Sequence, residues 1–271
     1  MEVYFHSNEN VLDKEQKPKY NITKEIYMLD LLKDVVTHTH SLGFLDIVKV
    51  TGDDKTTKLD SMADDRTVIM YGEVNAPVLE MQGVFGMPQL SKLKIHLDCP
   101  EYKENASIEV VTAERNGDTI PVGLHFENAA GDFKNDYRFM NTEIINEKLK
   151  TIKFRGVKWE VEIEPTLAAI QKFNYQAAAN NEHATFLTKT ENGNLKFVFG
   201  DQSTHGGEFV FATGVTGSLN KAWTWPVNQV LSILKIADVN NTKLSISNEG
   251  AMQIELDSGL ATYKYIIPAQ A

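Results

Sequence analysis

Apolar residues recur at helical spacing in four stretches of the chain. In residues 23–42, Met28, Leu32 and Val35 lie three or four positions apart, and Gly43 follows as a helix stop. We expect the other three helices to open at prolines, because the first turn tolerates the missing amide donor. These prolines and the apolar faces that follow them are Pro88 with Leu90, Leu93 and Leu97; Pro165 with Leu167, Ile170 and Phe173; and Pro226 with Val227, Val230, Leu231 and Leu234.

Alternation of apolar and polar residues predicts strands between and after these helices. A polar turn is expected around Gly52 and Asp53, and the Asn192-Gly193 pair is typical of a two-residue hairpin turn. The predicted strands are 45–50, 68–74, 107–113, 119–127, 133–140, 157–163, 184–190, 195–200, 208–215, 243–247, 252–256 and 261–267.

The order helix, strands, proline-opened helix, strands occurs twice along the chain. The helix starts are similarly spaced in the two halves, at 23 and 88 and then at 165 and 226. The sequence therefore predicts an α+β protein of two similar domains, each with two helices packed on antiparallel sheet. We place the N-terminal domain at 1–140 with an extension at 1–20, the connector between domains at 141–151, and the C-terminal domain at 152–271.

Charge and cysteine usage narrow the classes of protein that fit. The 271 residues carry a formal net charge of −10, which excludes a uniformly basic DNA-coating protein, so any DNA contact must be local. The single cysteine, Cys99, excludes an internal disulfide framework, and no apolar run approaches the ~20 residues of a membrane span. We accordingly expect a reducing, cytoplasmic setting.

The sequence lacks the motifs of common enzyme classes. It has no glycine-rich phosphate loop, no His-Glu-x-x-His, no paired-cysteine metal site and no Gly-x-Ser-x-Gly. His38 and His40 lie two positions apart, which turns their rings about 200° from each other on a helix, so we interpret them as surface histidines. We predict a protein that is not an enzyme and that holds no cofactor and no metal.

Two further segments carry a family resemblance: Trp225-Pro226-Val227-Asn228-Gln229 at the start of the last helix, and the terminal strand 263–268 with its short tail. With the order of elements over residues 21–271, they resemble the replication clamps of tailed phages, which are relatives of the proliferating cell nuclear antigen. The resemblance implies a DNA sliding clamp, a closed ring that encircles double-stranded DNA and tethers the replicative DNA polymerase. It also implies a clamp loader ATPase as partner and, for a phage protein, the host cell cytoplasm as location.

The width of duplex DNA bears on the number of chains in such a ring. If four helices of each chain line the hole about 10 Å apart, two chains give a hole about 25 Å wide and three give about 38 Å. A duplex of roughly 20 Å leaves room for side chains and water only in the larger ring. We therefore predict a homotrimer.

Contacts with DNA in a sliding ring are expected to reach phosphates through scattered polar groups, because base-specific contacts would stop the sliding. The alternative for the lysines involved is an ordinary solvated helix face. The first helix fits the hole less well, since Asp30, Asp34 and Thr37 point away from its apolar stripe. The candidate DNA-binding residues are Lys92, Lys94, Lys172, Lys221, Lys235, Asn228 and Gln171.

Ring closure requires an edge strand from each domain. By resemblance, strand 133–140 of one chain would pair with strand 208–215 of the next; the alternative is that both strands lie inside sheets. The candidate subunit contacts are Phe133, Tyr137, Phe139, Phe209 and Phe211.

Partner peptides of such clamps dock into an apolar pocket under the connector and beside the C-terminus. The alternative for apolar residues in these positions is packing onto their own domain. The residues implied here are Ile144, Ile145, Leu149, Ile266, Ile267 and Pro268.

Two other classes of function stay open at this point. A ring- or tube-forming virion structural protein would explain the acidity and the many strands, but not the paired proline-opened helices. An enzyme whose site is assembled from scattered residues would leave no motif in the sequence.

Overall fold

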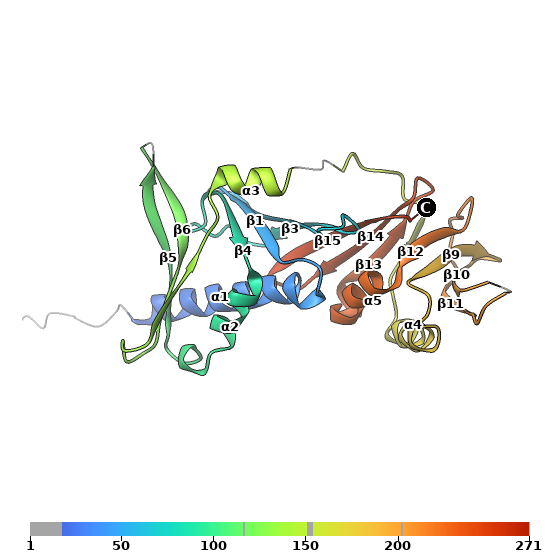
Figure 1. Cartoon of the computed structure of the whole chain (residues 1–271), viewed down its shortest axis with the longest axis horizontal. Helices are drawn as coiled ribbons and strands as arrows, with labels where there is room; N and C mark the ends of the chain where they lie inside the picture. The colour runs from blue at the N-terminus through green and yellow to red at the C-terminus, as the bar shows by residue number, and fades with distance from the viewer. Residues whose placement is uncertain (1–17, 116, 151–153, 202, 271) are drawn as a thin grey trace, which may run out of the picture.

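The computed structural model describes residues 18–115, 117–150, 154–201 and 203–270 (Figure 1). Over these ranges it holds five α-helices and three antiparallel sheets, which confirms the predicted α+β class. The first half comprises α1 Pro18–Thr37, β1 Ile47–Gly52, β2 Thr57–Met62, β3 Ile69–Val74, β4 Gly83–Pro88, α2 Leu90–Asp98, β5 Ser107–Arg115, β6 Asp118–Glu127 and β7 Lys134–Arg138. After α3 Thr142–Lys148, the second half comprises β8 Val161–Ile163, α4 Leu167–Ala179, β9 Thr185–Glu191, β10 Asn194–Phe199, β11 Gly207–Thr213, β12 Trp223–Pro226, α5 Val227–Ile236, β13 Thr242–Ile246, β14 Ala251–Asp257 and β15 Ala261–Pro268.

The strand order repeats in the two halves. The four strands between the long helices are ordered β4-β1-β2-β3 in the first half and β12-β9-β10-β11 in the second. The three strands after the second helix form the meanders β5-β6-β7 and β13-β14-β15. Pro88 and Pro226 end the equivalent strands β4 and β12, and a helix follows each closely. The tandem inferred from the proline spacing is therefore present in the topology.

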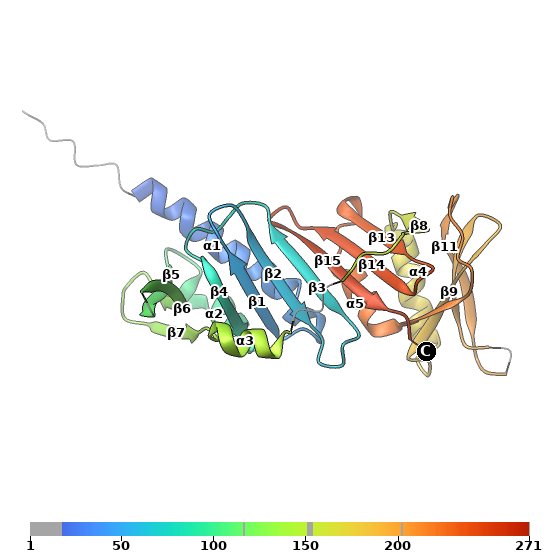
Figure 2. The same ribbon diagram turned by 90° about the horizontal axis from the view of Figure 1, so that it is seen from above.

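One strand pair joins the two halves. β3 pairs antiparallel with β15, from Val74 opposite Ala261 to Ile69 opposite Ile266. An eight-stranded sheet, β4-β1-β2-β3-β15-β14-β13-β8, thus runs through both halves (Figure 2). The strands equivalent to β3 and β15 are β11 and β7, and within the described residues each of these lies at the edge of its sheet. The alternative that both are interior strands does not hold for this part of the chain.

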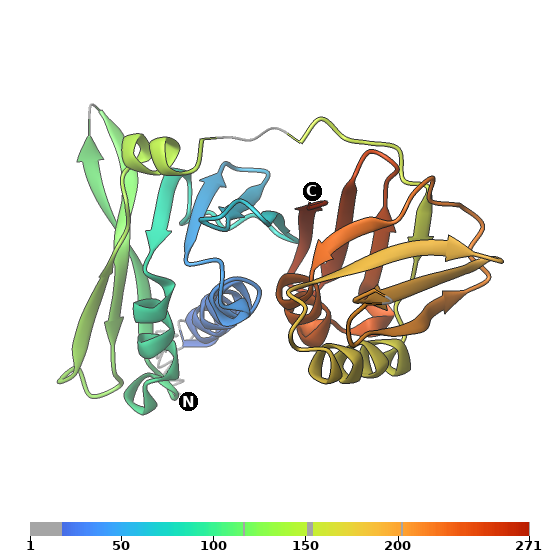
Figure 3. The same cartoon turned by 45° about the vertical axis from the view of Figure 1, so that its right-hand side comes forward.

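The long helices and the connector lie on opposite sides of the molecule. α1, α2, α4 and α5 gather on one side of the sheets, whereas α3 lies on the other (Figures 1 and 3). Buried apolar faces hold the helices there. They include the three leucines predicted for α2 and most of the apolar residues predicted for α5. Phe173 of α4 sits in a cluster of aromatic rings with Phe186, Phe197, Phe199, Phe209 and Phe211.

β2 occupies the segment where the sequence predicted only a polar turn. Its inward positions include two polar residues, Thr57 and Ser61, which are both buried. The Thr57 hydroxyl oxygen accepts a hydrogen bond from the Val78 amide at 2.9 Å, and Ser61 Oγ donates to the Ile47 carbonyl at 2.6 Å. The alternation is real, but it is not an alternation of apolar residues, so the hydrophobic pattern missed the strand.

Two other strands, β4 and β12, were also missed, and the prolines that end them, Pro88 and Pro226, were wrongly assigned to the helices that follow. Pro88 ends β4 instead of opening a helix, and α2 begins two residues later, after Gln89 in a left-handed conformation (φ 50°). β4 contains Gly86, where a Cβ would come within 2.8 Å of the Ile145 side chain. A glycine that makes room for a packed side chain looks, in the sequence, like a strand breaker.

The remaining differences concern element ends. α4 begins at Leu167, where Thr166 Oγ1 caps the helix by accepting from the Ala169 amide at 3.1 Å. Leu167, assigned to the apolar face, is 59% exposed. The strand expected at 157–163 is confined to β8. Most of the extension at 1–20 lies outside the described residues, and α1 begins at Pro18, earlier than expected.

Candidate functional surfaces

A mostly buried polar network joins α1 of the first half to β15 of the second. The Tyr263 hydroxyl donates to Asp34 Oδ2 at 2.8 Å, and the Tyr263 ring stacks on His38 with 4.3 Å between ring centroids. Ser258 Oγ donates to the same carboxylate oxygen at 2.9 Å, and the Tyr265 hydroxyl donates to the His38 carbonyl at 2.7 Å. We call this network the junction lock.

The junction lock favours a charged carboxylate. Burial raises the pKa of Asp34, but hydrogen bonds from His38, Tyr263 and Ser258, together with the charge of His38, outweigh burial and hold that pKa below its ordinary value. Desolvation and the neighbouring Asp34 raise the pKa of Tyr263 well above its usual range, so its hydroxyl keeps the proton that it donates. Two expectations are corrected here: His38 is buried rather than on the surface, and Asp34 does not face outward.

The aromatic side chains predicted to form the subunit contact lie at the two unpaired edges, β7 and β11. Tyr137 and Phe211 are buried in their own domains, where the Tyr137 hydroxyl donates to the Pro88 carbonyl at 2.5 Å. Phe139 and Phe209 are half-buried. Phe133, just before β7, is 41% exposed, and it offers the largest open aromatic surface of the set.

Charged side chains occupy the exposed positions of the same edges. On β11, Glu208 accepts from Lys196 at 2.7 Å and lies 2.9 Å from the Lys189 ammonium. On β7, Lys134 pairs with Glu127 at 3.0 Å. Surface pairs of this kind stabilise a single chain only slightly, so they leave these groups able to exchange partners.

The DNA-binding candidates differ in how free they are. Lys94 forms an ion pair with Asp98 one turn along α2, and Lys221 Nζ lies 3.9 Å from the centroid of the Trp223 ring. Lys221 is exposed in a loop, and the candidates that are exposed on the long helices are Lys92 on α2, Gln171 and Lys172 on α4, and Asn228 and Lys235 on α5.

Sequence reasoning missed two apolar residues on the outward helix faces. Ile95 of α2 is 68% exposed and Tyr175 of α4 is 70% exposed. Each lies three residues after an exposed lysine, Lys92 or Lys172, and therefore on the same helix face as that lysine. On α1, Asp30 stays exposed but is accompanied by Lys33, so this helix is less acidic than the sequence indicated.

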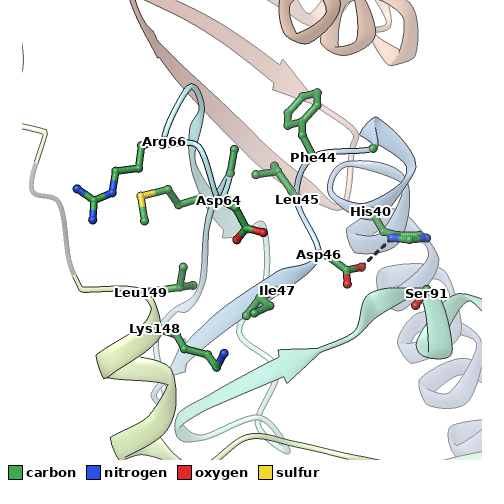
Figure 4. A pocket seen from close by; sticks show the side chains of 13 residues that line it. His40, Phe44, Leu45, Asp46, Ile47, Asp64, Arg66, Ser91, Lys148 and Leu149 are labelled. Atoms are coloured by element: carbon green, nitrogen blue, oxygen red, sulfur yellow. Dashed lines mark hydrogen bonds and ion pairs between the residues drawn. The ribbon is translucent and has the colours of Figure 1, made fainter.

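A pocket of about 500 Å³ lies beside the start of the connector, between the segment before β1, the β2–β3 turn and the end of α3 (Figure 4). Leu149 lies between Arg66 and Lys148, while His40 Nδ1 lies 2.9 Å from Asp46 Oδ1 on the far side (Figure 4). Arg66 and Lys148 form no ion pair with any described residue. Arg66 also has a left-handed backbone (φ 59°), which costs about 1–3 kcal/mol outside glycine.

Of the six residues proposed for the partner pocket, the structure places only Leu149 in the lining of this cavity. Ile145 is fully buried against Gly86, and Ile266 and Ile267 are buried in β15. Ile144 and Pro268 are exposed but do not line it. Arg66 and Lys148 were missed, because a turn arginine and a helix-end lysine carry no apolar signal.

Metal binding and membrane crossing find no support in the described part of the chain. No three His, Cys, Asp or Glu side chains gather there in a group that could hold a metal ion. None of the helices described is long and apolar enough to cross a membrane.

Comparison with known proteins identifies the fold. No protein-family model matches the chain, and no curated protein matches its sequence. Among solved structures, the chain resembles PCNA of A. fulgidus bound to the C-terminal region of FEN-1, with a TM-score of 0.65 and 11% identity over 90% of this chain and 96% of that one. It also resembles PCNA from Thermococcus kodakaraensis (TM-score 0.63, 10% identity, 89% and 97% covered) and from Entamoeba histolytica (0.62, 8%, 90% and 95%). The chain has the fold of proliferating cell nuclear antigen, the sliding-clamp fold predicted from its sequence.

Proposed function

We propose that the protein is a DNA sliding clamp, a ring of three chains that encircles double-stranded DNA and tethers the replicative polymerase. The observation that carries the proposal is the repeated junction: the edges that β3 and β15 join inside the chain recur as the unpaired edges of β11 and β7. A contact between β7 of one chain and β11 of the next is head-to-tail, and such contacts close into a ring when the rotation fits. Kinship with tailed-phage clamps in particular stays a prediction.

The helices give this ring a DNA-facing surface. With α1, α2, α4 and α5 on one side of the sheets, a ring that turns this side inward has twelve helices around its hole. Lys92, Lys172 and Lys235 would meet phosphates there, while the net negative charge of the chain faces outward. Few and scattered cations suit a ring that must hold DNA without stopping on it.

These lysines have a direct test. Replacing Lys92, Lys172 and Lys235 with Ala is expected to weaken retention on circular DNA and to reduce the slope of its salt dependence by up to about one per lost phosphate contact. A matched control removes three exposed lysines that are not on the long helices: Lys55, Lys58 and Lys158. Equal effects of the two triple variants would place the first three lysines outside the hole.

Partner proteins are proposed to dock at the pocket beside the connector. Leu149, Ile47 and Met62 supply an apolar lining, while Arg66 and Lys148 stand on either side of Leu149 (Figure 4). This arrangement fits a segment with an apolar anchor and acidic neighbours. Arg66→Gln with Lys148→Gln should lower polymerase stimulation without altering chain assembly, whereas Lys55→Gln with Lys103→Gln should change neither.

The function itself is tested by polymerase extension on primed circular DNA, with the cognate polymerase, its clamp loader and ATP. We expect longer products when the protein is present, and loss of that gain on short linear DNA, from whose ends a ring slides off. No change in product length on the circular template would contradict the proposal.

A further inference from the structure

We propose that the seam between neighbouring chains forms in one defined register, with Phe133 of one chain opposite Phe209 of the next and Lys134 opposite Glu208. The inference rests on the proposed ring, and it adds the residues that hold each seam and the reason that the seams open more easily than the junction inside the chain. The register of the seam follows from matching β11 and β7 with β3 and β15, which already pair inside the chain.

The equivalence of β11 with β3 follows from the strand registers. Pro88 at the end of β4 pairs with the first residue of β1, and Pro226 at the end of β12 pairs with the first residue of β9. Three residues further along the chain are Val50 in β1 and Thr188 in β9. In the first half, Val50 pairs with Leu59, which pairs with Gly72. In the second half, Thr188 pairs with Phe197, which pairs with Phe209, so Gly72 and Phe209 are equivalent.

The equivalence of β7 with β15 follows from two isolated bridges. Gly86 pairs with Met140 and Thr224 pairs with Gln270, and each first member lies two residues before the strand-ending proline. Seven residues before each bridge partner stand Phe133 and Tyr263, followed by Lys134 and Lys264. Burial agrees with this match, since both lysines are exposed.

The pairing of β3 with β15 predicts which residues of β11 and β7 lie opposite each other at the seam. Inside the chain, Tyr263 lies opposite Gly72, and Lys264 lies opposite Tyr71. The equivalent residues place Phe133 opposite Phe209, and Lys134 opposite Glu208. Aromatic pairs and opposite charges in directly opposed positions are the cross-strand pairs that stabilise antiparallel ladders.

The helix behind each strand supports the same match. In α1, His38 bonds to the Asp34 carboxylate and carbonyl one turn earlier, at 3.1 and 2.9 Å. In α4, Asn180 repeats this contact with the Gln176 amide oxygen and carbonyl, at 2.9 and 2.8 Å.

The seam differs from the junction lock on both of its strands, and the two differences match each other. Where the junction has a carboxylate acceptor, Asp34, and a hydroxyl donor, Tyr263, the seam has the neutral Gln176 and the hydroxyl-free Phe133. Because Gln176 carries no charge, it does not need the hydroxyl donor that Asp34 receives from Tyr263, and a phenylalanine is sufficient at position 133. This paired replacement is expected if Phe133 of one chain covers Gln176 and Asn180 of the next.

The seam is therefore weaker and more sensitive to salt than the junction. It lacks the buried carboxylate–tyrosine bond, and its charged pair, Lys134 with Glu208, lies at exposed edge positions where salt screens it. A ring built in this way opens between chains, while each chain keeps its two domains together.

Disulfide trapping tests the register. In a Cys99→Ser background, Lys134→Cys with Glu208→Cys puts thiols at directly opposed positions, whose Cβ atoms lie about 4.5–5.5 Å apart, close to what a disulfide spans. Lys134→Cys with Val210→Cys moves the second thiol two residues along the same face. Under mild oxidation, we expect at least tenfold more covalent trimer from the first pair.

The outcomes separate the register from the function. A native trimer that is trapped only by the shifted pair, or equally by both pairs, contradicts the register but leaves the clamp in place. A protein that stays a monomer at every concentration tested contradicts the register and the ring together.

Discussion

The junction between β3 and β15 and the proposed seam between β7 and β11 use the same strands of the repeat but different chemistry. The junction buries Tyr263 and Tyr265 completely and ties them to Asp34 and His38. The seam offers an exposed Phe133 and a neutral amide pair. The comparison teaches that one duplicated contact can be made permanent within the chain and separable between chains by a few buried polar groups.

The largest expected effect comes from deleting the ring of Tyr263. Tyr263→Ala leaves a cavity and removes one of the hydrogen-bond donors to Asp34, and it should lower the free energy of unfolding by about 3–5 kcal/mol. Phe133→Ala, at the equivalent position of the open edge, should change the same quantity by less than about 0.5 kcal/mol. Urea unfolding of dilute protein measures both, and equal losses would remove the distinction between junction and seam.

The next effect comes from giving the junction the chemistry of the seam. Asp34→Asn with Tyr263→Phe gives the junction a neutral amide and a hydroxyl-free ring at nearly unchanged shape, so it removes the charged hydrogen bond and should cost about 1.5–3 kcal/mol of stability at neutral pH.

The same variant should also lose part of the acid sensitivity of the protein. The folded-state pKa of Asp34 lies below its unfolded value of about 3.9, so the carboxylate stabilises the fold above that pH. This contribution disappears as the pH falls through the folded-state pKa. We therefore expect the gap in stability between wild type and variant to close below about pH 4; a gap that stays constant would mean that the carboxylate charge has no part in the lock.

Phe133→Ala should act on assembly instead of on the fold. Removing an aromatic ring from each seam is expected to weaken every contact between chains by about 1–2 kcal/mol, which is roughly tenfold in the dissociation constant. Sedimentation over a range of concentrations would show the shift towards monomer. Tyr175→Ala, which removes an exposed ring outside the proposed seam, is the matched control and should leave the assembly unchanged.

The smallest expected effect is the exchange of the charged pair. Lys134→Glu puts like charges opposite each other at each seam and should cost about 0.2–1 kcal/mol per pair, an effect that shrinks at high salt. Adding Glu208→Lys restores opposite charges and should recover part of the lost association. Failure of the second change to rescue the first would place these residues apart.

The sequence predicted the repeat and the buried helix faces because both depend on regular spacing. Leu90, Leu93 and Leu97 follow the helical period and are buried, and the Asn192-Gly193 turn joins β9 to β10 with positive φ at both residues. Short-range signals of this kind survive folding unchanged.

Features that depend on distant contacts escaped prediction. Thr57 and Ser61 can be buried in a strand because distant backbone groups bond to their hydroxyls, and Gly86 leaves room for Ile145 of another element. The pocket beside the connector was missed for the same reason. Arg66 and Lys148 come to the same pocket only in the folded chain.

The central claim is that the two unpaired edges close a ring of three chains, and native mass spectrometry with negative-stain imaging tests it most directly. The account predicts a species three times the mass of the 30.4 kDa chain and particles with six lobes around an open centre. A monomer at micromolar concentration, or a stacked tube, would contradict it.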